Sequence, residues 1–381
     1  MKTSTVEPGT APHTDTVSAP PASSAVASRA AGLRNFTDRL DRRLERLRRG
    51  HSWTELRLPI LCVVLAVGGF LLLPDDFLYA GATALSSGVI GIGLFFPMAT
   101  LRELSLNAAG LAGVSAYTYA HLASSGTASK GVGGIINGLI VAVLAVMSIS
   151  VIGGLAALVV TGLYFLVASL VIQAAIEKVA FSISGFTGGA AGWFVPQPDL
   201  GTGWFDTSRA VYLIVAAVTL AATWITYRVL RSRFGMHATV VGQVPEGATA
   251  VGLRNWLLKL SVFAYAGALI ALGGILLAFS NGTPPATARF GLVWSVIYLA
   301  IPIASGLKDL SGVLLMAVIF TVTPIVIEPW NVAPNLVSGM ILLVATILGF
   351  YRGRWWTIIR DTYWRIRGVT PAAATAAVEG A

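Results

Sequence analysis

Long runs of apolar residues, separated by short polar segments, follow one another along most of this chain. Each run is near or somewhat under the roughly 20 residues that an α-helix needs to cross the hydrocarbon core of a bilayer. Ten runs are expected to form spans: 56–73, 77–98, 104–123, 135–153, 162–181, 211–230, 256–279, 290–306, 310–327 and 337–351. The first and last are short, so we expect them to be tilted, extended by flanking residues or partly re-entrant. The pattern predicts an all-α fold, a polytopic bundle of transmembrane helices.

Polar segments flank this transmembrane domain, residues 56–351, on both sides. Residues 1–32 are rich in Ala, Ser, Thr and Pro, and we expect a disordered cytoplasmic tail that is not cleaved. Over 33–50, apolar residues recur every three or four positions opposite arginines, which predicts an amphipathic juxtamembrane helix on an anionic membrane surface. A solvated charged helix fits that pattern equally well. Residues 352–381 are expected to form a basic cytoplasmic tail.

Composition supports the membrane assignment. Hydrophobic residues make up 55% of the chain, charged residues only 11%, and the mean hydropathy is +0.77. A soluble domain has no place to bury that much apolar surface. The 41 glycines suggest close helix approach within a bilayer. The one cysteine, Cys62, cannot form a disulfide within the chain.

The formal net charge of +9 is distributed unevenly, and its pattern predicts an orientation. With ten spans and both termini in the cytoplasm, most Lys and Arg fall in inner loops, as the positive-inside rule requires. The basic residues on the inner side include Arg228, Arg231, Arg233, Arg254, Lys308 and the arginines of both tails. Those on the outer side are Lys130, Lys178, Arg209 and Arg289. Nucleic-acid binding is not expected, because it needs a basic face on a water-exposed domain.

The sequence offers no recognisable catalytic or metal-binding motif. We find no phosphate-binding loop of the form G-x-x-x-x-G-K-[ST] and no G-x-S-x-G nucleophile elbow. The four histidines are too scattered to place two ligands on one helical face. We therefore expect no enzyme activity, no metal and no cofactor in this chain.

Two pairs of charged residues lie near predicted span ends, Arg102 with Glu103 and Glu177 with Lys178. A charge inside a span marks an ion path, because burying it in hydrocarbon is costly. We instead expect both pairs to lie at the level of the lipid headgroups and to reach water.

Four stretches carry a family resemblance. The first combines residues 91–94, 104–106 and 113–118; the second combines 162–165 with 187–189 and Gly192; the third combines 232–235 with Gly252; the last is 303–312. In order and spacing they resemble the LivM-type permease subunit of branched-chain amino acid ABC importers, over about residues 56–351. The chain departs from the family at Arg102 and Glu103, which replace a Gly-Gln pair. It departs again at 236–247, where Pro245 is expected to interrupt a helix.

The resemblance implies a permease subunit that imports a small polar solute, with branched-chain or other amino acids first among the candidates. It also implies a second permease subunit, cytoplasmic ATPase subunits that use the ATP, an extracellular substrate-binding protein, membrane lipids around the chain, and a bacterial plasma membrane location. The implied substrate-pathway residues are Asn107, Ser115 and Tyr117. The implied ATPase coupling loop contains Arg233, Phe234, Gly235, Glu246 and Gly252. The implied binding-protein-facing loop contains Thr187, Gly188, Gly189 and Trp193.

Two other functions stay open. An ATP-independent carrier or channel is favoured by the departures in the coupling loop. A structural or assembly protein of the membrane is compatible with the same apolar pattern. Co-purification with an ATPase distinguishes the ABC permease from these two alternatives. Solute flux without ATP distinguishes the carrier or channel from the structural protein.

Overall fold

The computed structural model describes residues 75–124, 132–160, 162–189, 192–197, 207–250, 252–305, 310–327 and 339–340. The longer helices in this part are α3 (Asp75–Thr100), α4 (Ala108–Ser124), α5 (Val132–Val159), α6 (Leu163–Ala175), α8 (Thr207–Arg231), α11 (Asn255–Asn281), α12 (Leu292–Ala304) and α13 (Leu310–Ile327). The shorter ones are the π-helix η1 (Ile176–Ala180), α7 (Ser184–Thr187), α9 (Arg233–Gln243), α10 (Pro245–Ala250) and the 3-10 helix η2 (Thr287–Phe290). Among these residues no strand occurs, so the all-α prediction is confirmed there.

Five helices in the described ranges are long and apolar enough to cross a membrane. They are Leu78–Thr100, Leu139–Val159, Leu163–Ala180, Ser208–Arg231 and Asn255–Asn281. Leu292–Ala304 and Leu310–Thr323 are shorter apolar helices at two further predicted positions. The tails, the span expected at 56–73 and nearly all of 337–351 lie outside the described residues. The count of ten spans and the orientation stay predictions.

The helix expected at 104–123 differs from its prediction. The backbone of 101–107 is not helical, and α4 begins only at Ala108. Polar Ser105 and Asn107 occupy this segment, and such side chains favour bonds with nearby groups over continuing a helix. The result is a break between α3 and α4, residues 101–107, followed by a helix of 17 residues that is largely buried.

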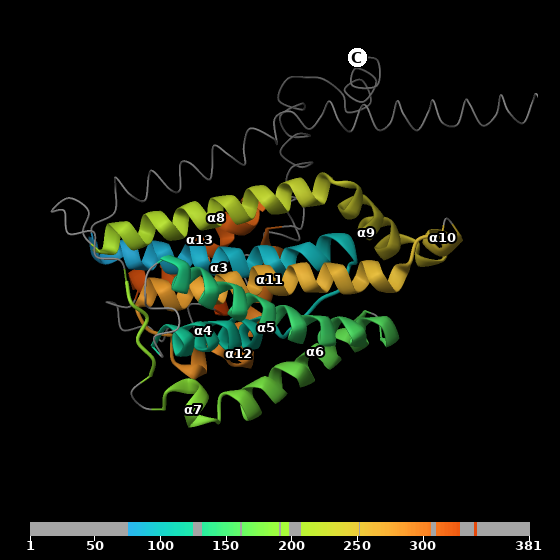
Figure 1. Cartoon of the computed structure of the whole chain (residues 1–381). Coiled ribbons are helices and arrows are strands. Elements are labelled where there is room, and N and C mark those ends of the chain that lie inside the picture. Colours follow the sequence, from blue (N-terminus) through green and yellow to red (C-terminus); the bar gives the residue numbers. More distant parts are fainter. Residues whose placement is uncertain are drawn as a thin grey trace, which may run out of the picture. The chain divides into compact units, whose positions relative to one another are not determined.

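α3 and α11 form the centre of the bundle (Figure 1). α3 contacts α8, α11, α12 and α13, and α11 also contacts α4 and α5. The two central helices approach closely at Gly273, where an added Cβ would lie 2.9 Å from the Ile90 nitrogen and 3.0 Å from the Ser86 carbonyl oxygen. Only glycine fits such a backbone approach, which is a common way of packing helices in membranes.

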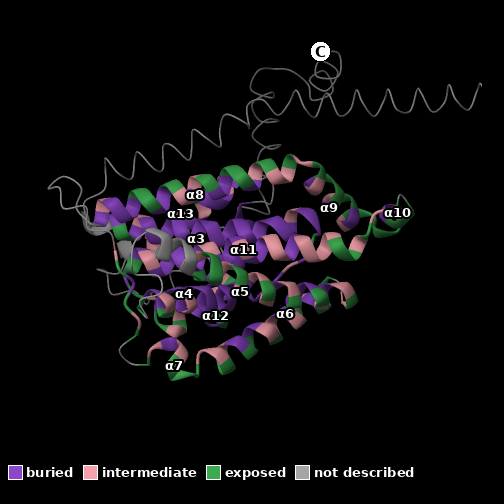
Figure 2. Ribbon diagram, in the orientation of Figure 1, coloured by how far each residue is buried: buried purple, intermediate pink, exposed green. Residues whose placement is uncertain are grey.

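α5 and α6 expose much of their surface, and α6 lies at the edge of the bundle in Figure 2. Their apolar stretches are 28% and 22% buried, against 94% for α3 and 72% for α11. Large apolar side chains cover their exposed faces, including Ile140, Leu144, Leu155, Tyr164, Val167 and Val171. An apolar face of this length needs lipid or another protein chain to cover it.

The short helices mark opposite ends of the bundle. α9 and α10 extend from one end, beyond α8 and α11, and α7 lies at the other end (Figure 1). The two predicted loops, one for an ATPase and one for a binding protein, therefore lie far apart.

Candidate functional site

The break between α3 and α4 begins where α3 ends at Thr100. The Leu101 amide donates to the Pro97 carbonyl oxygen at 2.8 Å, and Arg102 then turns into the left-handed region with φ 58°. A residue in that conformation ends a helix and is usually glycine. The Arg102 side chain is exposed, as predicted. The turn directs the next residue, Glu103, back into the protein.

Glu103 is buried, so the prediction that its side chain reaches water is wrong. One carboxylate oxygen, Oε1, accepts a hydrogen bond of 3.1 Å from Lys259 Nζ of α11. Lys259 also donates to the Ala157 carbonyl oxygen at 3.0 Å, near the end of α5. The other oxygen, Oε2, has no hydrogen-bond partner within the described part of the chain. Burial raises the pKa of the Glu103 carboxyl, although Lys259 opposes the shift. The second predicted pair lies in η1, where Glu177 is half-buried and Lys178 is exposed.

Side chains from other helices cap the N-terminus of α4. The first amides of a helix have no partner within it. Here Leu106 N–H donates to Ser169 Oγ at 2.9 Å, Ala109 N–H to Ser295 Oγ at 3.1 Å, and Gly110 N–H to Gln173 Oε1 at 2.8 Å. Sequence reasoning missed these caps, Ser169 and Gln173 of α6 and Ser295 of α12. The available signal was the presence of polar residues within otherwise apolar runs.

The three predicted pathway residues lie in the protein interior. Asn107 is buried just before α4, and its Oδ1 bonds to Ser105 Oγ. Ser115 donates to the Ala112 carbonyl oxygen at 2.8 Å, and the Tyr117 hydroxyl donates to the Pro285 carbonyl oxygen at 2.9 Å. All three therefore have partners in the fold, and their role in a solute pathway stays a prediction.

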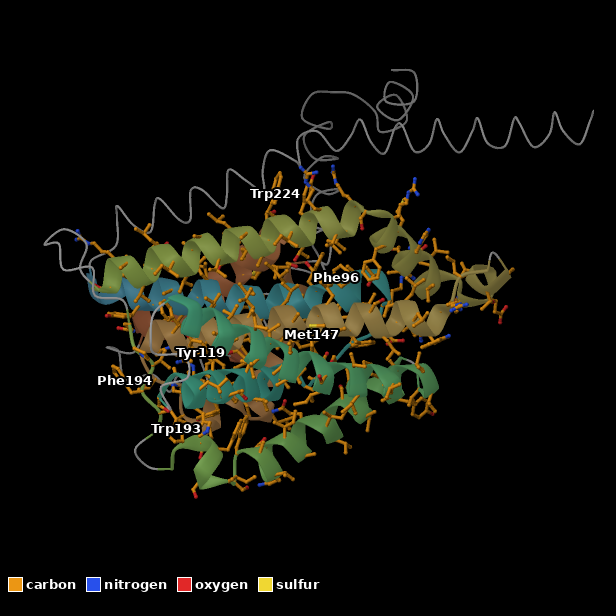
Figure 3. All side chains as sticks on the ribbon, in the orientation of Figure 1. Phe96, Tyr119, Met147, Trp193, Phe194 and Trp224 are labelled. Atoms are coloured by element: carbon orange, nitrogen blue, oxygen red, sulfur yellow. The ribbon has the colours of Figure 1, made fainter. Side chains whose placement is uncertain are left out.

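Tyr117 lies among aromatic rings at the α7 end of α4. Its ring centroid is 5.7 Å from that of Phe181, 6.0 Å from Phe186 and 5.9 Å from Phe290. Trp193 lies nearby, with its Nε1 donating to the Phe186 carbonyl oxygen at 2.9 Å and its ring 4.7 Å from His121 (Figure 3).

The predicted binding-protein-facing loop has a defined shape. Thr187 is the last residue of α7, and it is buried with its Oγ1 donating to Ile183 at 3.2 Å. Gly188 and Gly189 follow with φ of 80° and 61°, so the chain turns sharply there. Further on, the Val195 amide donates to the Gly282 carbonyl oxygen at 2.8 Å, beyond the end of α11. These turns and bonds hold the described residues of this segment, 187–189 and 192–197, in place.

The predicted coupling loop forms two helices, α9 and α10. Ser232 caps α9 by accepting from the Gly235 amide at 3.4 Å, and Arg233 is exposed. Phe234 stacks on Phe96 of α3, with ring centroids 6.3 Å apart. The expected interruption is confirmed, since α9 ends at Gln243 and Pro245 begins α10. Proline is favoured at the first position of a helix because its missing amide has no partner there anyway.

The remaining predicted coupling residues lie around α10. Glu246 is exposed in its first turn. Gly252 follows α10 with φ 83°, and its amide donates to the Thr249 carbonyl oxygen at 2.9 Å. This turn leads the chain directly into α11.

α9 packs against the break. An added Cβ on Gly242 would lie 2.2 Å from the Thr100 carbonyl oxygen and 2.6 Å from Leu101 Cα. A separate small core surrounds this contact, which we name the α9–α10 core. It consists of Phe96, Leu101, Ala157, Phe165, Ala238, Val241, Ala248, Val262 and Phe263. Figure 3 shows Phe96 near the end of α3 that faces α9.

Residues 78–348 match the family described as "Branched-chain amino acid transport system / permease component". Two curated relatives are the galactose/methyl galactoside import permease proteins MglC of Escherichia coli (strain K12) and Salmonella typhimurium (strain LT2), which are 29% and 28% identical over 178 residues. Each alignment covers 44% of this chain and 51% of the relative, so the chain spans about half the length of the curated relatives it matches. No solved structure matches significantly.

Proposed function

Because the chain belongs to the family of permease components of branched-chain amino acid transport systems, we propose that it is the membrane-spanning permease subunit of an ABC importer. The importer moves a small polar solute across a bacterial plasma membrane. This chain forms part of the path, and separate cytoplasmic ATPase subunits hydrolyse the ATP. A second permease subunit and an extracellular substrate-binding protein complete the assembly.

The surface of α9 and α10 is the observation that carries this proposal. Met236 is 57% exposed, Val240 46% and Val244 56%, and they follow at intervals of four residues. That spacing places Met236 and Val240 on one face of α9, with Val244 just beyond its end. An apolar helix face at the end of a bundle is suited to the groove of a partner protein. We assign this face, flanked by Arg233 and Glu246, to the ATPase.

The opposite end of the bundle is assigned to the binding protein. Phe194 is 68% exposed there, in the segment that follows the Trp193 contacts. The glycine turn at 188–189 and the Val195 bond to Gly282 hold this segment in place. A preformed loop loses little conformational freedom when a partner binds, which favours recognition.

The solute is proposed at the level of its class. The family description names branched-chain amino acids, whereas the relatives' names give galactose and methyl galactoside. Both are small and polar. We keep amino acids first and add hexoses as the second group to be tested.

An ATP-independent carrier or channel is the second candidate. It is favoured by the buried carboxylate of Glu103, because an ionisable group inside a membrane protein is a common part of an ion path.

A pull-down from the native host in mild detergent tests the proposal. We expect an ATPase and a second permease to co-purify with this chain. The double variant Met236→Asp with Val240→Asp should no longer co-purify with the ATPase, because two charges on the apolar face oppose its burial. Phe194→Asp, an equally drastic change of an exposed apolar residue at the other end, retains it. Recovery of solute flux driven by an ion gradient, with no ATPase in any preparation, would support the carrier instead.

A further inference from the structure

We propose that Glu103 and Lys259 are a positioning pair that connects the break between α3 and α4 with the α9–α10 segment. Through this pair, and through the packing of α9 on the break, movement of α9 and α10 reaches the N-terminus of α4. The inference rests on the proposed function, because it assumes that α9 and α10 receive the force of a partner. Neither residue was among the coupling residues expected from the sequence.

The first connection is direct contact between α9 and the break. At Gly242 the backbone of α9 lies against Thr100 and Leu101, so close that a Cβ would not fit. Leu101 is buried in the α9–α10 core with Ala238 and Val241. Backbones in contact at this distance cannot move independently.

The second connection joins α10 to the start of α11. Asn255 Nδ2 donates to the Pro245 carbonyl oxygen at 2.8 Å, and the Leu253 amide donates to the Ala248 carbonyl oxygen at 3.0 Å. These bonds join both ends of α10 to the segment that begins α11. A displacement of α10 is therefore passed to the first turn of α11.

The third connection is the ion pair. Lys259 is one helical turn beyond Asn255, on the same face of α11. Its ammonium reaches Glu103 at 3.1 Å and Ala157 O at 3.0 Å. The side chains of Lys259 and Glu103 are only 14% and 5% exposed, so water screens this interaction little. The break is thus joined to the α9–α10 segment directly through α9 and indirectly through α11.

Movement of Glu103 is transmitted to α4 over a short path. Only four residues separate it from Ala108, where α4 begins. The amides of Leu106, Ala109 and Gly110 bond to α6 and α12 side chains, so a shift of the break changes how three helices meet. Chains of packed side chains, hydrogen bonds and ion pairs between rigid helices carry coupling between distant sites.

An ion pair is suited to this role because the free-energy cost of changing it depends on whether one partner or both are replaced. Removing one partner leaves the other buried without compensation, whereas replacing both together is much less harmful. The pair therefore adds little net stability but fixes one arrangement of the break relative to α11.

The experiment compares Glu103→Gln, Lys259→Met, the conservative Lys259→Arg and the exchanged pair Glu103→Lys with Lys259→Glu. Arg228→Gln is the matched control, because it removes an exposed positive charge from α8 outside the three connections. The full complex is reconstituted with its co-purified partners. ATP hydrolysis and uptake of labelled L-leucine and labelled D-galactose are measured in the same proteoliposomes.

We expect Glu103→Gln and Lys259→Met to retain the ATPase and its ATP hydrolysis but to move about fivefold less solute per ATP, the lower end of typical coupling effects. Lys259→Arg and the exchanged pair recover most of the wild-type ratio. A merely structural role predicts instead that uptake and hydrolysis fall together with the amount of folded protein, and that outcome would overturn the inference. So would an exchanged pair no better than the single variants.

Hydrogen exchange of the purified chain in detergent provides a readout that needs neither partner nor solute. Glu103→Gln should raise amide exchange about fivefold at 105–110 and also at 233–250, while 310–327 stays unchanged. An increase confined to 105–110 contradicts the connection, whatever the transport assays give. If the wild-type chain recruits no ATPase while Glu103→Gln still shows the joint increase, the proposed function is refuted and the connection stands.

Discussion

Gln173 supports two backbone groups with one side chain. Its Oε1 accepts from the Gly110 amide of α4, and its Nε2 donates to the Phe290 carbonyl oxygen of η2, each at 2.8 Å. Gln173→Leu keeps the approximate volume but leaves both groups buried and unpaired. We expect a loss of roughly 2 kcal/mol or more in the free energy of unfolding, measured by thermal or denaturant unfolding in detergent. Gln243→Leu, at an exposed site on α9, is the control; an equal effect there would contradict the assignment.

Protonation of Glu103 affects the overall stability of the fold and the ion pair with Lys259 in opposite directions. Burial raises its pKa above the ordinary value of 4.5, so the folded state holds the proton to a higher pH than the unfolded state does. The stabilisation gained by holding that proton is therefore full below 4.5 and is lost as pH rises through the folded pKa. The ion pair with Lys259, in contrast, forms over the same pH interval, because the Glu103 carboxyl becomes negatively charged when it loses the proton.

Acidification should therefore raise the thermal stability of the wild type relative to Glu103→Gln while it loosens the break. The measurement is the difference in melting temperature between the two proteins across the pH series, with amide exchange at 105–110 followed in parallel. Lys259 from α11 is the charged group that faces the carboxyl, and the neighbouring Arg102 is exposed. A melting-temperature difference that falls on acidification, or amide exchange at 105–110 that slows, would contradict this account.

At this scale, the sequence predicted chemistry poorly because partners are set by tertiary structure. Arg102 and Glu103 are adjacent in the sequence, yet the Arg102 side chain is exposed. The Glu103 side chain is buried with Lys259, which lies 156 positions away. The left-handed turn at Arg102 separates them, and no periodicity signals a non-glycine residue in that conformation.

The placement of α9 against the break depends on Gly242. The Gly242→Ala variant places a Cβ 2.2 Å from the Thr100 carbonyl oxygen, so α9 must move away from the break. We expect a loss of about 1–3 kcal/mol in stability, as for other overpacked sites, together with less solute moved per ATP. Gly185→Ala is the control, since an added Cβ there meets nothing within 4 Å. Equal melting temperatures for the two variants would show that the contact is not needed.

Elements with a strong apolar pattern were predictable, and those determined by packing were not. The expected runs 310–327 and 256–279 match α13 and α11 closely, because a long apolar run needs only length and composition. The start of α4 was missed by four residues, because Leu104 and Leu106 extend the apolar pattern into the break. The π-helix at Ile176–Ala180 has no sequence pattern of its own and was invisible within the run 162–181.

The basic residues of α8 lie at its two ends. Arg228 and Arg231 lie in the last turn of α8 and Arg209 near its first turn, and a helix of 25 residues is about 37 Å long. Figure 1 shows α9 and α10 beyond the end of α8 that carries the two arginines. The positive-inside rule then predicts that α9 and α10 face the cytoplasm and the segment at 192–197 faces outward.

Cysteine labelling in intact cells tests this orientation. Cys62 is the one cysteine of the chain, so Cys62→Ser gives a background without thiols. Into it we would introduce Thr249→Cys on α10 or Phe194→Cys at the opposite end, both at exposed sites. A membrane-impermeant maleimide should label the Phe194→Cys protein in intact cells and the Thr249→Cys protein only after permeabilisation.

The labelling result bears on the ATPase as well as on topology. ATP is hydrolysed on the cytoplasmic side, so a coupling surface on α9 and α10 requires that Thr249→Cys be protected in intact cells. Ala317→Cys, on the buried face of α13, is the control for reagent entering the protein and should stay unlabelled throughout. Labelling of Thr249→Cys from outside would invert the orientation and remove the ATPase assignment. The ion pair would still join the break to α11, but its force would then have to come from the outer side, to which we assign the proposed binding protein.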